Sequence, residues 1–179
     1  MSKAFTREDD LPEAGPPKRL PSVFPPGAMN YLTPDGAKRL RAELDTLLDS
    51  KLPAPAAGPM EDAARARRQA VAERIHELRR ILDSAVILAP PADDLDVVRF
   101  GATVSVRHLA DGGTMRYRIV GVDETDVTRG WISWVSPVAA ALLCASVGDR
   151  VRAALPSGEK DLEILDVTYE QAEAADPGS

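Results

Sequence analysis

The spacing of apolar residues changes once along this 179-residue chain, and that change constrains the fold more than any other feature. Between Thr33 and Ala85, apolar residues recur at intervals of three and four, the period of a helix with one buried face. From Val97 onward they alternate with polar residues, the period of a half-buried strand. The sequence therefore predicts helices first and a sheet second, an α+β architecture.

Two helices are predicted in the first part, because prolines interrupt the apolar stripe. The first begins at Thr33, whose hydroxyl suits an N-cap, with Pro34 at the first helical position, and it ends near Lys51. The second starts near Met60 or Glu61. Together they predict an antiparallel helical hairpin, a coiled coil whose seam contains Leu40, Leu44, Leu47, Val71, Ile75 and Leu78. The alternative is that both helices pack on a globular core.

Turn signals divide the second part into short strands, the clearest being Asp111-Gly112-Gly113 between two alternating segments. A small antiparallel sheet with one short helix is expected. Strands are predicted around Val104–Val106 and Tyr117–Ile119, at Trp131–Trp134, Val151–Leu155 and Leu162–Tyr169, and the helix at Val138–Ala145 after Pro137. The chain is thus expected to consist of a Pro-rich disordered tail (1–29), the hairpin (30–89), a linker (90–96), the sheet domain (97–171) and a short tail (172–179).

Composition excludes several classes of protein. A net charge of -6 argues against a nonspecific nucleic-acid coat, because phosphate binding needs clustered Lys and Arg. The single cysteine, Cys144, forms no internal disulfide and is expected to be a small buried hydrophobe in a reducing compartment. No apolar run approaches the ~18 residues of a membrane span, and the N-terminus lacks a signal-peptide core. A cytoplasmic protein with no membrane partner is expected.

The sheet region carries a recognisable order of motifs. Gly121-Val122-Asp123-Glu124 is followed by Ser133–Pro137, then Ala139–Leu143, then Val147-Gly148-Asp149. This order resembles the C-terminal domain of the GreA/GreB family of bacterial transcript-cleavage factors, with Arg118–Glu124 closest to the GreB branch. The stretch Tyr31–Leu44 is similar to the opening "LT-x-x-G…L-x-x-EL" of the same family. The resemblance covers about residues 30 to 170 and implies an FKBP-like fold for the sheet domain, without isomerase activity.

The resemblance also implies that the sheet domain docks on RNA polymerase, at the rim of its secondary channel. The implied docking residues are Trp134, Ser136, Pro137 and Leu142. Related docking loops often read Asp-Ser-Pro, whereas this chain has Val135-Ser136-Pro137 and so lacks one polar contact. Ser136 and Pro137 have an alternative interpretation as a strand-to-helix junction in which the serine caps the helix.

At the hairpin tip, cleavage-competent family members carry a Gly-Asp-x-Ser-Glu-Asn-Ala motif, whose acids help to hold Mg²⁺ in the polymerase active site. The predicted tip, residues 51–62, lacks this motif, and Glu61 and Asp62 are its only acids. They either handle Mg²⁺ or stabilise the positive end of a helix. Neighbouring residues on a helix diverge by ~100°, a poor geometry for joint metal binding. The first helix would extend roughly 28 Å at 1.5 Å per residue, which is short for this family.

Arginines gather on the outer face of the second helix. The resemblance implies that Arg65, Arg67, Arg68 and Arg74 form a basic patch facing nascent RNA, and the alternative is a solvated helix face. No catalytic residue, intrinsic metal or other cofactor is expected, and any Mg²⁺ would be bound by the polymerase.

The expected function is that of a monomeric, non-enzymatic regulator of transcription elongation that binds the secondary channel of bacterial RNA polymerase. Contacts with nascent RNA or DNA are expected only within the polymerase complex. The absent tip motif and short hairpin resemble Rnk-type relatives and predict no strong stimulation of transcript cleavage. The alternatives are an active Gre-type cleavage factor and, from a different class, an interaction module for a protein other than polymerase.

Overall fold

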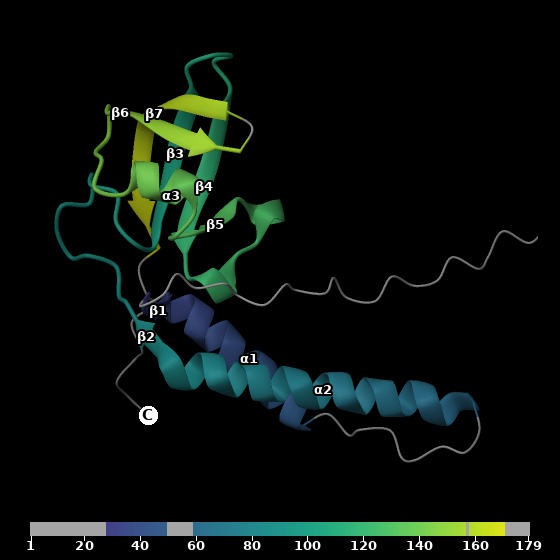
Figure 1. The fold of residues 1–179 in the computed structure, drawn as a ribbon. Helices are drawn as coiled ribbons and strands as arrows, with labels where there is room; N and C mark the ends of the chain where they lie inside the picture. The colour runs from purple at the N-terminus through teal and green to yellow at the C-terminus, as the bar shows by residue number, and fades with distance from the viewer. Residues whose placement is uncertain (1–27, 50–58, 157, 171–179) are drawn as a thin grey trace, which may run out of the picture.

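A computed structural model describes residues 28–49, 59–156 and 158–170 of the chain as a helical hairpin attached to a five-stranded sheet (Figure 1). Most of the predicted tail 1–29, the predicted tail 172–179 and the Pro-rich segment between the helices lie outside the described residues. Within the described ranges, no helix combines the length and the apolar character needed to cross a membrane.

The hairpin consists of α1 (Pro34–Asp49) and α2 (Pro59–Ser84), which lie side by side (Figure 1). The predicted start of α1 is confirmed, because Thr33 Oγ1 accepts a hydrogen bond of 3.0 Å from the backbone N–H of Gly36. At 1.5 Å per residue, the 16 residues of α1 span about 24 Å and the 26 residues of α2 about 39 Å. The hairpin therefore extends further than the length of its first helix predicts.

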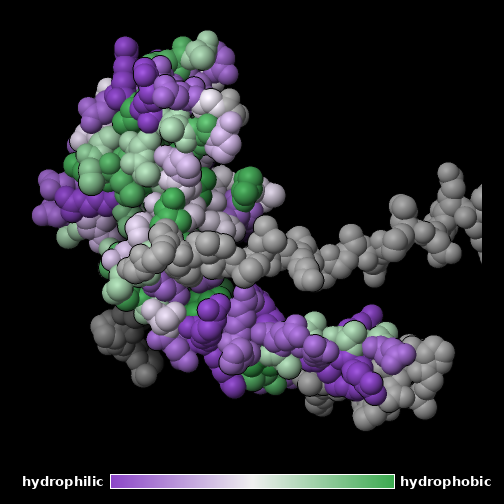
Figure 2. All heavy atoms as spheres, viewed as in Figure 1, coloured by the Kyte–Doolittle hydropathy of each residue, from purple (hydrophilic) through white to green (hydrophobic). Residues whose placement is uncertain are grey.

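The hairpin has its own apolar cluster, formed along the facing stripes of the two helices. Of the predicted seam, Leu40, Leu44, Leu47 and Leu78 belong to this cluster, whereas Val71 and Ile75 are half-buried. The buried members are Leu32, Ala37, Leu40, Leu78 and Ile81. The opposite faces are charged, and Figure 2 shows hydrophilic side chains over most of the visible hairpin.

Two short strands that the sequence did not predict close the base of the hairpin. β1 (Asn30–Leu32) pairs in parallel with β2 (Ala85–Ile87), and the N–H of Leu88 donates to the carbonyl of Leu32 at 3.0 Å. Three residues are too few to show a period of two, so the hydrophobic pattern carries no signal for these strands.

The sheet has the order β5-β4-β3-β7-β6. Its strands are β3 (Ala102–His108), β4 (Thr114–Val120), β5 (Trp131–Ser133), β6 (Arg150–Leu155) and β7 (Gly158–Tyr169). The α+β class is confirmed, but the predicted antiparallel sheet is mixed, because β5 runs parallel to β4. The connection between them contains two 3₁₀ turns, η1 (Val122–Glu124) and η2 (Val127–Arg129). It brings the chain back so that Trp131, the first residue of β5, pairs with Arg118 of β4.

The helix of the sheet domain, α3 (Pro137–Leu142), packs against the sheet and helps to enclose a second apolar core. The core includes Val104, Val106, Ile119, Leu142, Leu162 and Ile164, each at most 2% exposed. The predicted turn at residues 111–113 is confirmed, with Gly112 at a φ of 73°. The prediction that Cys144 is buried is wrong, because this residue follows the end of α3 with a φ of 67° and is exposed.

The hairpin core supplies a prediction about stability. Leu78 is completely buried, so Leu78→Ala is expected to lower the free energy of unfolding by about 2–5 kcal/mol. The matched control Leu48→Ala removes the same atoms from a side chain that is 48% exposed and should change stability by less than about 0.5 kcal/mol. Urea unfolding followed by circular dichroism at 222 nm measures both. Equal effects for the two variants would contradict the assignment of the seam.

Candidate docking loop and domain junction

The loop between β5 and α3 is held in one conformation by its own hydrogen bonds. Ser136 Oγ accepts from the backbone N–H of Ala139 at 3.2 Å and thereby caps α3, and Pro137 occupies the first turn of that helix. The N–H of Ser136 donates to the carbonyl of Ser133 at 2.9 Å. The capping interpretation of Ser136 is therefore confirmed, and the cap presents Pro137 as an exposed residue at the surface.

The other two residues expected in the docking site are less accessible. Leu142 has no exposed surface and lies in the core of the sheet domain, so it supports the loop from beneath and is not available to a partner. Trp134 is half-buried, and its ring lies 5.3 Å from that of Tyr31, at the base of the hairpin. Its indole N–H is buried without a hydrogen-bond partner among the described residues. The docking loop is thus in contact with the junction between the two domains.

A buried carboxylate, that of Glu124, connects the sheet domain to the start of the hairpin. Glu124 is 4% exposed and belongs to η1. Its Oε2 accepts from the backbone N–H of Thr33 at 2.8 Å and from that of Gly121 at 3.0 Å, and its Oε1 accepts from the hydroxyl of Thr33. Arg39 of α1 lies 3.6 Å from Oε1. Donors from both domains therefore converge on a single carboxylate.

Two glycines allow the domains to approach this closely. A Cβ at Gly36, in the first turn of α1, would overlap the carboxylate of Glu124. A Cβ at Gly121 would overlap the backbone oxygen of Tyr31. Both positions therefore require glycine for close packing and not for backbone conformation, since neither has a positive φ.

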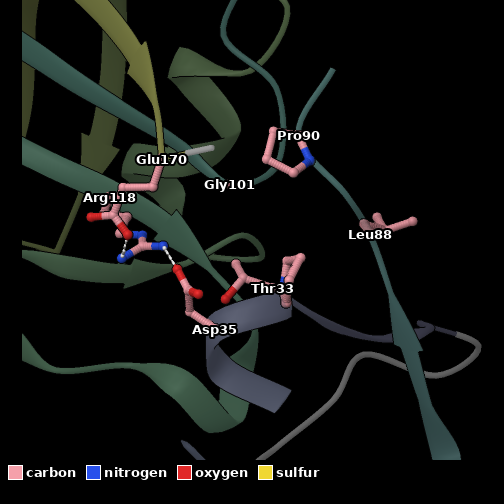
Figure 3. Close-up of a pocket in the computed structure, with 8 residues that line it drawn as sticks. Thr33, Asp35, Leu88, Pro90, Gly101, Arg118 and Glu170 are labelled. Carbon is pink, nitrogen blue, oxygen red and sulfur yellow. Dashed lines mark hydrogen bonds and ion pairs between the residues drawn. The ribbon is translucent and has the colours of Figure 1, made fainter. Parts of the chain in front are cut away.

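A second polar contact at the junction involves Arg118 of β4, which is 8% exposed (Figure 3). Its guanidinium lies 3.5 Å from Asp35 Oδ2 at the start of α1 and 2.7 Å from Glu170 Oε2 after β7. Arg118 also lines a cavity of about 10 Å³, together with Thr33, Leu88, Pro90 and Gly101. A cavity of this size can hold about one water molecule and has no room for an organic ligand.

Three guanidinium groups surround the ring of Trp131 in β5. Arg39, Arg118 and Arg129 lie 4.5, 5.0 and 5.2 Å from the ring centre. Burial lowers the pKa of the Arg39 guanidinium; Glu124 opposes that shift, and the other two arginines add to it. Stacking on an aromatic face favours cations, so Trp131 helps to hold three like charges close together.

The expected basic patch on α2 is only partly available for nucleic acid. Arg65 and Arg67 are exposed and Arg68 is half-exposed. Arg74 is half-buried within the hairpin, where its Nε lies 2.7 Å from Glu43 and its Nη1 lies 2.7 Å from Glu77. The hydrogen bond to Glu43 is the main cause of a raised pKa at Arg74. Arg74 therefore joins α1 to α2 and does not belong to an outward-facing patch.

Both tip acids lie in the first turns of α2. Asp62 is exposed, whereas the side chain of Glu61 lies outside the described part of the structure. Two consecutive positions of a helix face directions about 100° apart, which does not favour joint binding of one metal ion. Among the described residues, no group of three or more His, Cys, Asp and Glu side chains is arranged to hold a metal ion.

Sequence reasoning did not identify the roles of Glu124 and Arg118 at the junction. One signal was present, since a glycine in the first turn of a helix costs stability and so indicates a close approach by another group. Gly36 is such a residue. The identity of the approaching group depends on the fold, because Thr33 and Glu124 are far apart in the sequence.

Comparison with known proteins finds relatives that align with more than half of the chain. The family model "Transcription elongation factor, GreA/GreB, C-term" matches residues 92–169. The chain is 36% identical to the transcription elongation factor GreB of Xanthomonas axonopodis pv. citri (strain 306), an alignment that covers 77% of this chain and 90% of the relative. It is 38% identical to GreA of Helicobacter pylori (strain ATCC 700392 / 26695), over 61% of this chain and 66% of the relative. A solved GreA/GreB structure from Nitrosomonas europaea is 24% identical over 78% of this chain and 98% of its own, with a TM-score of 0.39.

The packing at Gly36 predicts that Gly36→Ala lowers the stability of the protein, the opposite of what helix propensity predicts. Helix propensity alone predicts that Gly36→Ala stabilises α1 by about 1 kcal/mol. We expect the opposite, a loss of about 1–3 kcal/mol, because the new methyl group displaces the Glu124 carboxylate and leaves its donors unpaired. In a Glu124→Ala background the same substitution should be neutral or stabilising. Urea unfolding of the four proteins gives the coupling, and a stabilising effect in both backgrounds would exclude the steric contact.

Proposed function

The chain belongs to the GreA/GreB family of transcription elongation factors, and we propose that it regulates elongation by binding bacterial RNA polymerase at the secondary channel. In this proposal the sheet domain docks on the polymerase and the hairpin points into the channel. The protein itself is not an enzyme, and it acts as a monomer in the cytoplasm, where bacterial transcription takes place.

The proposal that the sheet domain docks is supported chiefly by the conformation of the Ser136–Pro137 loop. The helix cap at Ser136 and the hydrogen bond to Ser133 hold the loop rigid, so little conformational entropy is lost on binding. Pro137, the first residue of α3, is exposed, and the half-buried Trp134 precedes it by three residues. Leu142 is buried and is therefore not part of the proposed contact surface.

Weak or absent stimulation of transcript cleavage is supported by the chemistry of the tip. Mg²⁺ needs oxygen ligands at about 2.1 Å in near-octahedral geometry, and catalysis by a factor requires that its acids reach such positions together. Glu61 and Asp62 follow one another on α2, an arrangement that suits a helix N-terminus better than a shared metal. The length of the hairpin does not support this proposal, because α2 alone spans about 39 Å. The missing tip motif and the adjacency of the two acids are what support it.

Contacts with nucleic acid are proposed only within the polymerase complex, through the exposed Arg65 and Arg67 with Arg68 beside them. The overall charge of -6 does not favour free RNA or DNA, whereas a local basic face near the channel would attract phosphates. Any Mg²⁺ involved would be held by the polymerase.

One observation favours a second candidate, a protein-interaction module with a different partner. Val135 stands where related loops often have an aspartate, so one polar contact with polymerase is missing. Capture of core polymerase by the purified full-length chain distinguishes the two candidates, since only the first predicts it.

The docking proposal predicts the effect of one loop substitution. Pro137→Ala is expected to weaken binding to core polymerase roughly tenfold, about 1.4 kcal/mol, because an exposed, preorganised contact is lost. Leu109→Ala is the control, since Leu109 is an exposed apolar residue of another turn in the same domain. Fluorescence anisotropy with labelled polymerase measures both affinities. If Leu109→Ala weakens binding and Pro137→Ala does not, the docking loop is assigned wrongly.

The cleavage proposal is tested on backtracked polymerase. The protein is expected to leave the RNA length nearly unchanged on a gel, and to reduce the cleavage stimulated by an active Gre factor when both are added, because both would occupy one site. Robust Mg²⁺-dependent shortening of the RNA, abolished by Glu61→Ala with Asp62→Ala, would instead establish an active cleavage factor.

A further inference from the structure

We propose that Glu124 is a positioning residue, whose carboxylate sets the direction in which the hairpin leaves the sheet domain. The functional consequence rests on the function proposed above, but the positioning itself is a property of the free protein.

Across the junction, the carboxylate of Glu124 accepts two hydrogen bonds from Thr33. The backbone N–H of Thr33 donates to Oε2 at 2.8 Å, and the Thr33 hydroxyl donates to Oε1. That hydroxyl has one proton, so its oxygen accepts the N–H of Gly36 in the first turn of α1 at 3.0 Å. A continuous chain of hydrogen bonds thus runs from η1 into the backbone of the helix. Such bonds are directional and hold α1 in orientation as well as in place.

Within its own domain, the carboxylate is held equally firmly. Oε2 also accepts from the N–H of Gly121 at 3.0 Å, at the start of the same 3₁₀ turn. Glu124 is 4% exposed, so water cannot easily replace a lost donor. Movement of α1 relative to η1 therefore leaves either the carboxylate or its donors unpaired.

The other junction contacts described above are less restrictive. Tyr31 contacts Trp134 and Phe100 at ring separations of 5.3 and 5.8 Å, and the orientation preference of such ring pairs is weaker and broader than that of a charge-assisted hydrogen bond. The ion pair of Arg118 with Asp35 is long, at 3.5 Å, and the Asp35 side chain is 39% exposed, so it contributes little. Arg39 of α1 also stacks on Trp131 at 4.5 Å, but its side chain is 46% exposed. Among the described residues, hydrogen bonding between the domains that is buried on both sides is therefore concentrated at Glu124.

This placement connects the direction of the hairpin to the docking loop. Trp134 precedes Ser136 and Pro137 and contacts Tyr31, only two residues before Thr33. If the loop docks at the rim of the polymerase channel, the Glu124 contact determines whether α1 and α2 point into it.

The test measures a distance between the domains in the full-length free protein. Spin labels are attached to cysteines at the exposed positions Arg67 of α2 and Thr114 of β4, in a Cys144→Ser background because Cys144 is exposed. Double electron–electron resonance then gives the distribution of distances. The parent protein is expected to show one narrow distribution.

Glu124→Gln is expected to shift and broaden that distribution. The amide oxygen can accept the two backbone N–H groups, but the NH₂ group then faces Thr33 and Arg39, so the Thr33 hydroxyl proton loses its acceptor and Arg39 loses its counter-charge. Thr33→Val removes the hydroxyl that donates to Glu124 and should also shift and broaden the distribution. Thr33→Ser keeps a hydroxyl at this position and should show the parent distribution. Glu163→Gln is the matched control, because Glu163 pairs with Arg107 and Arg150 inside the sheet domain.

The proposal is overturned if folded Glu124→Gln keeps the parent distribution, or if the parent is already as broad as the variant. Far-UV circular dichroism checks that each variant is folded. If Glu124→Gln does not fold, the comparison of Thr33→Val with Thr33→Ser decides the question in the same way.

A second measurement separates this inference from the proposed function. Core polymerase should still capture Glu124→Gln, because the docking loop is unchanged, but the variant should compete less well than the parent with an active Gre factor. Equal competition by a variant with a shifted distance would show that the hairpin direction does not matter for function. Failure of polymerase to capture even the parent would refute the proposed function, while the distances would still decide the role of Glu124.

Discussion

The carboxylate of Glu124, buried against the first turn of α1, is the interaction on which the arrangement of the two domains depends. Burying a charge is costly unless donors replace its water, and here the Thr33 and Gly121 donors do so. The first turn of α1 and the guanidinium of Arg39, 3.6 Å from Oε1, place further positive charge beside the carboxylate. Gly36 is explained by the same contact, because any side chain there would occupy the space of the carboxylate.

Each domain on either side of this contact has its own apolar core. The hairpin core lies along the α1–α2 seam, and the sheet core lies under α3. Between them lie polar and aromatic contacts, among them Glu124 with Thr33, Arg39 with Trp131, and Tyr31 with Trp134. This division allows the Ser136–Pro137 loop and the start of α2 to change independently, because they belong to domains with separate apolar cores. It is consistent with a family member that keeps the C-terminal domain of the family while its tip lacks the cleavage motif.

Much of this architecture could be predicted from the sequence, because hydrophobic period and turn residues are local signals. The cap at Thr33, the turn at residues 111–113 and the α+β class were predicted correctly for that reason. The parallel β5 was not, because a three-residue strand has no clear period and its partner is chosen by the connection before it. Leu142 and Arg74 resembled site residues by sequence position, but burial and ion pairing are set by neighbours from other elements. The role of Glu124 was missed for the same reason.

The two tryptophans of the chain both lie beside this junction. Trp131 is surrounded by Arg39, Arg118 and Arg129, and Trp134 contacts Tyr31 with its indole N–H shielded. The helices α1 and α2 contain no tryptophan. Intrinsic fluorescence of the unmodified protein therefore originates at the boundary between the domains, where emission wavelength and quenching depend on nearby charges and on access of water. The molecule thus carries a native optical reporter of how its two parts are joined.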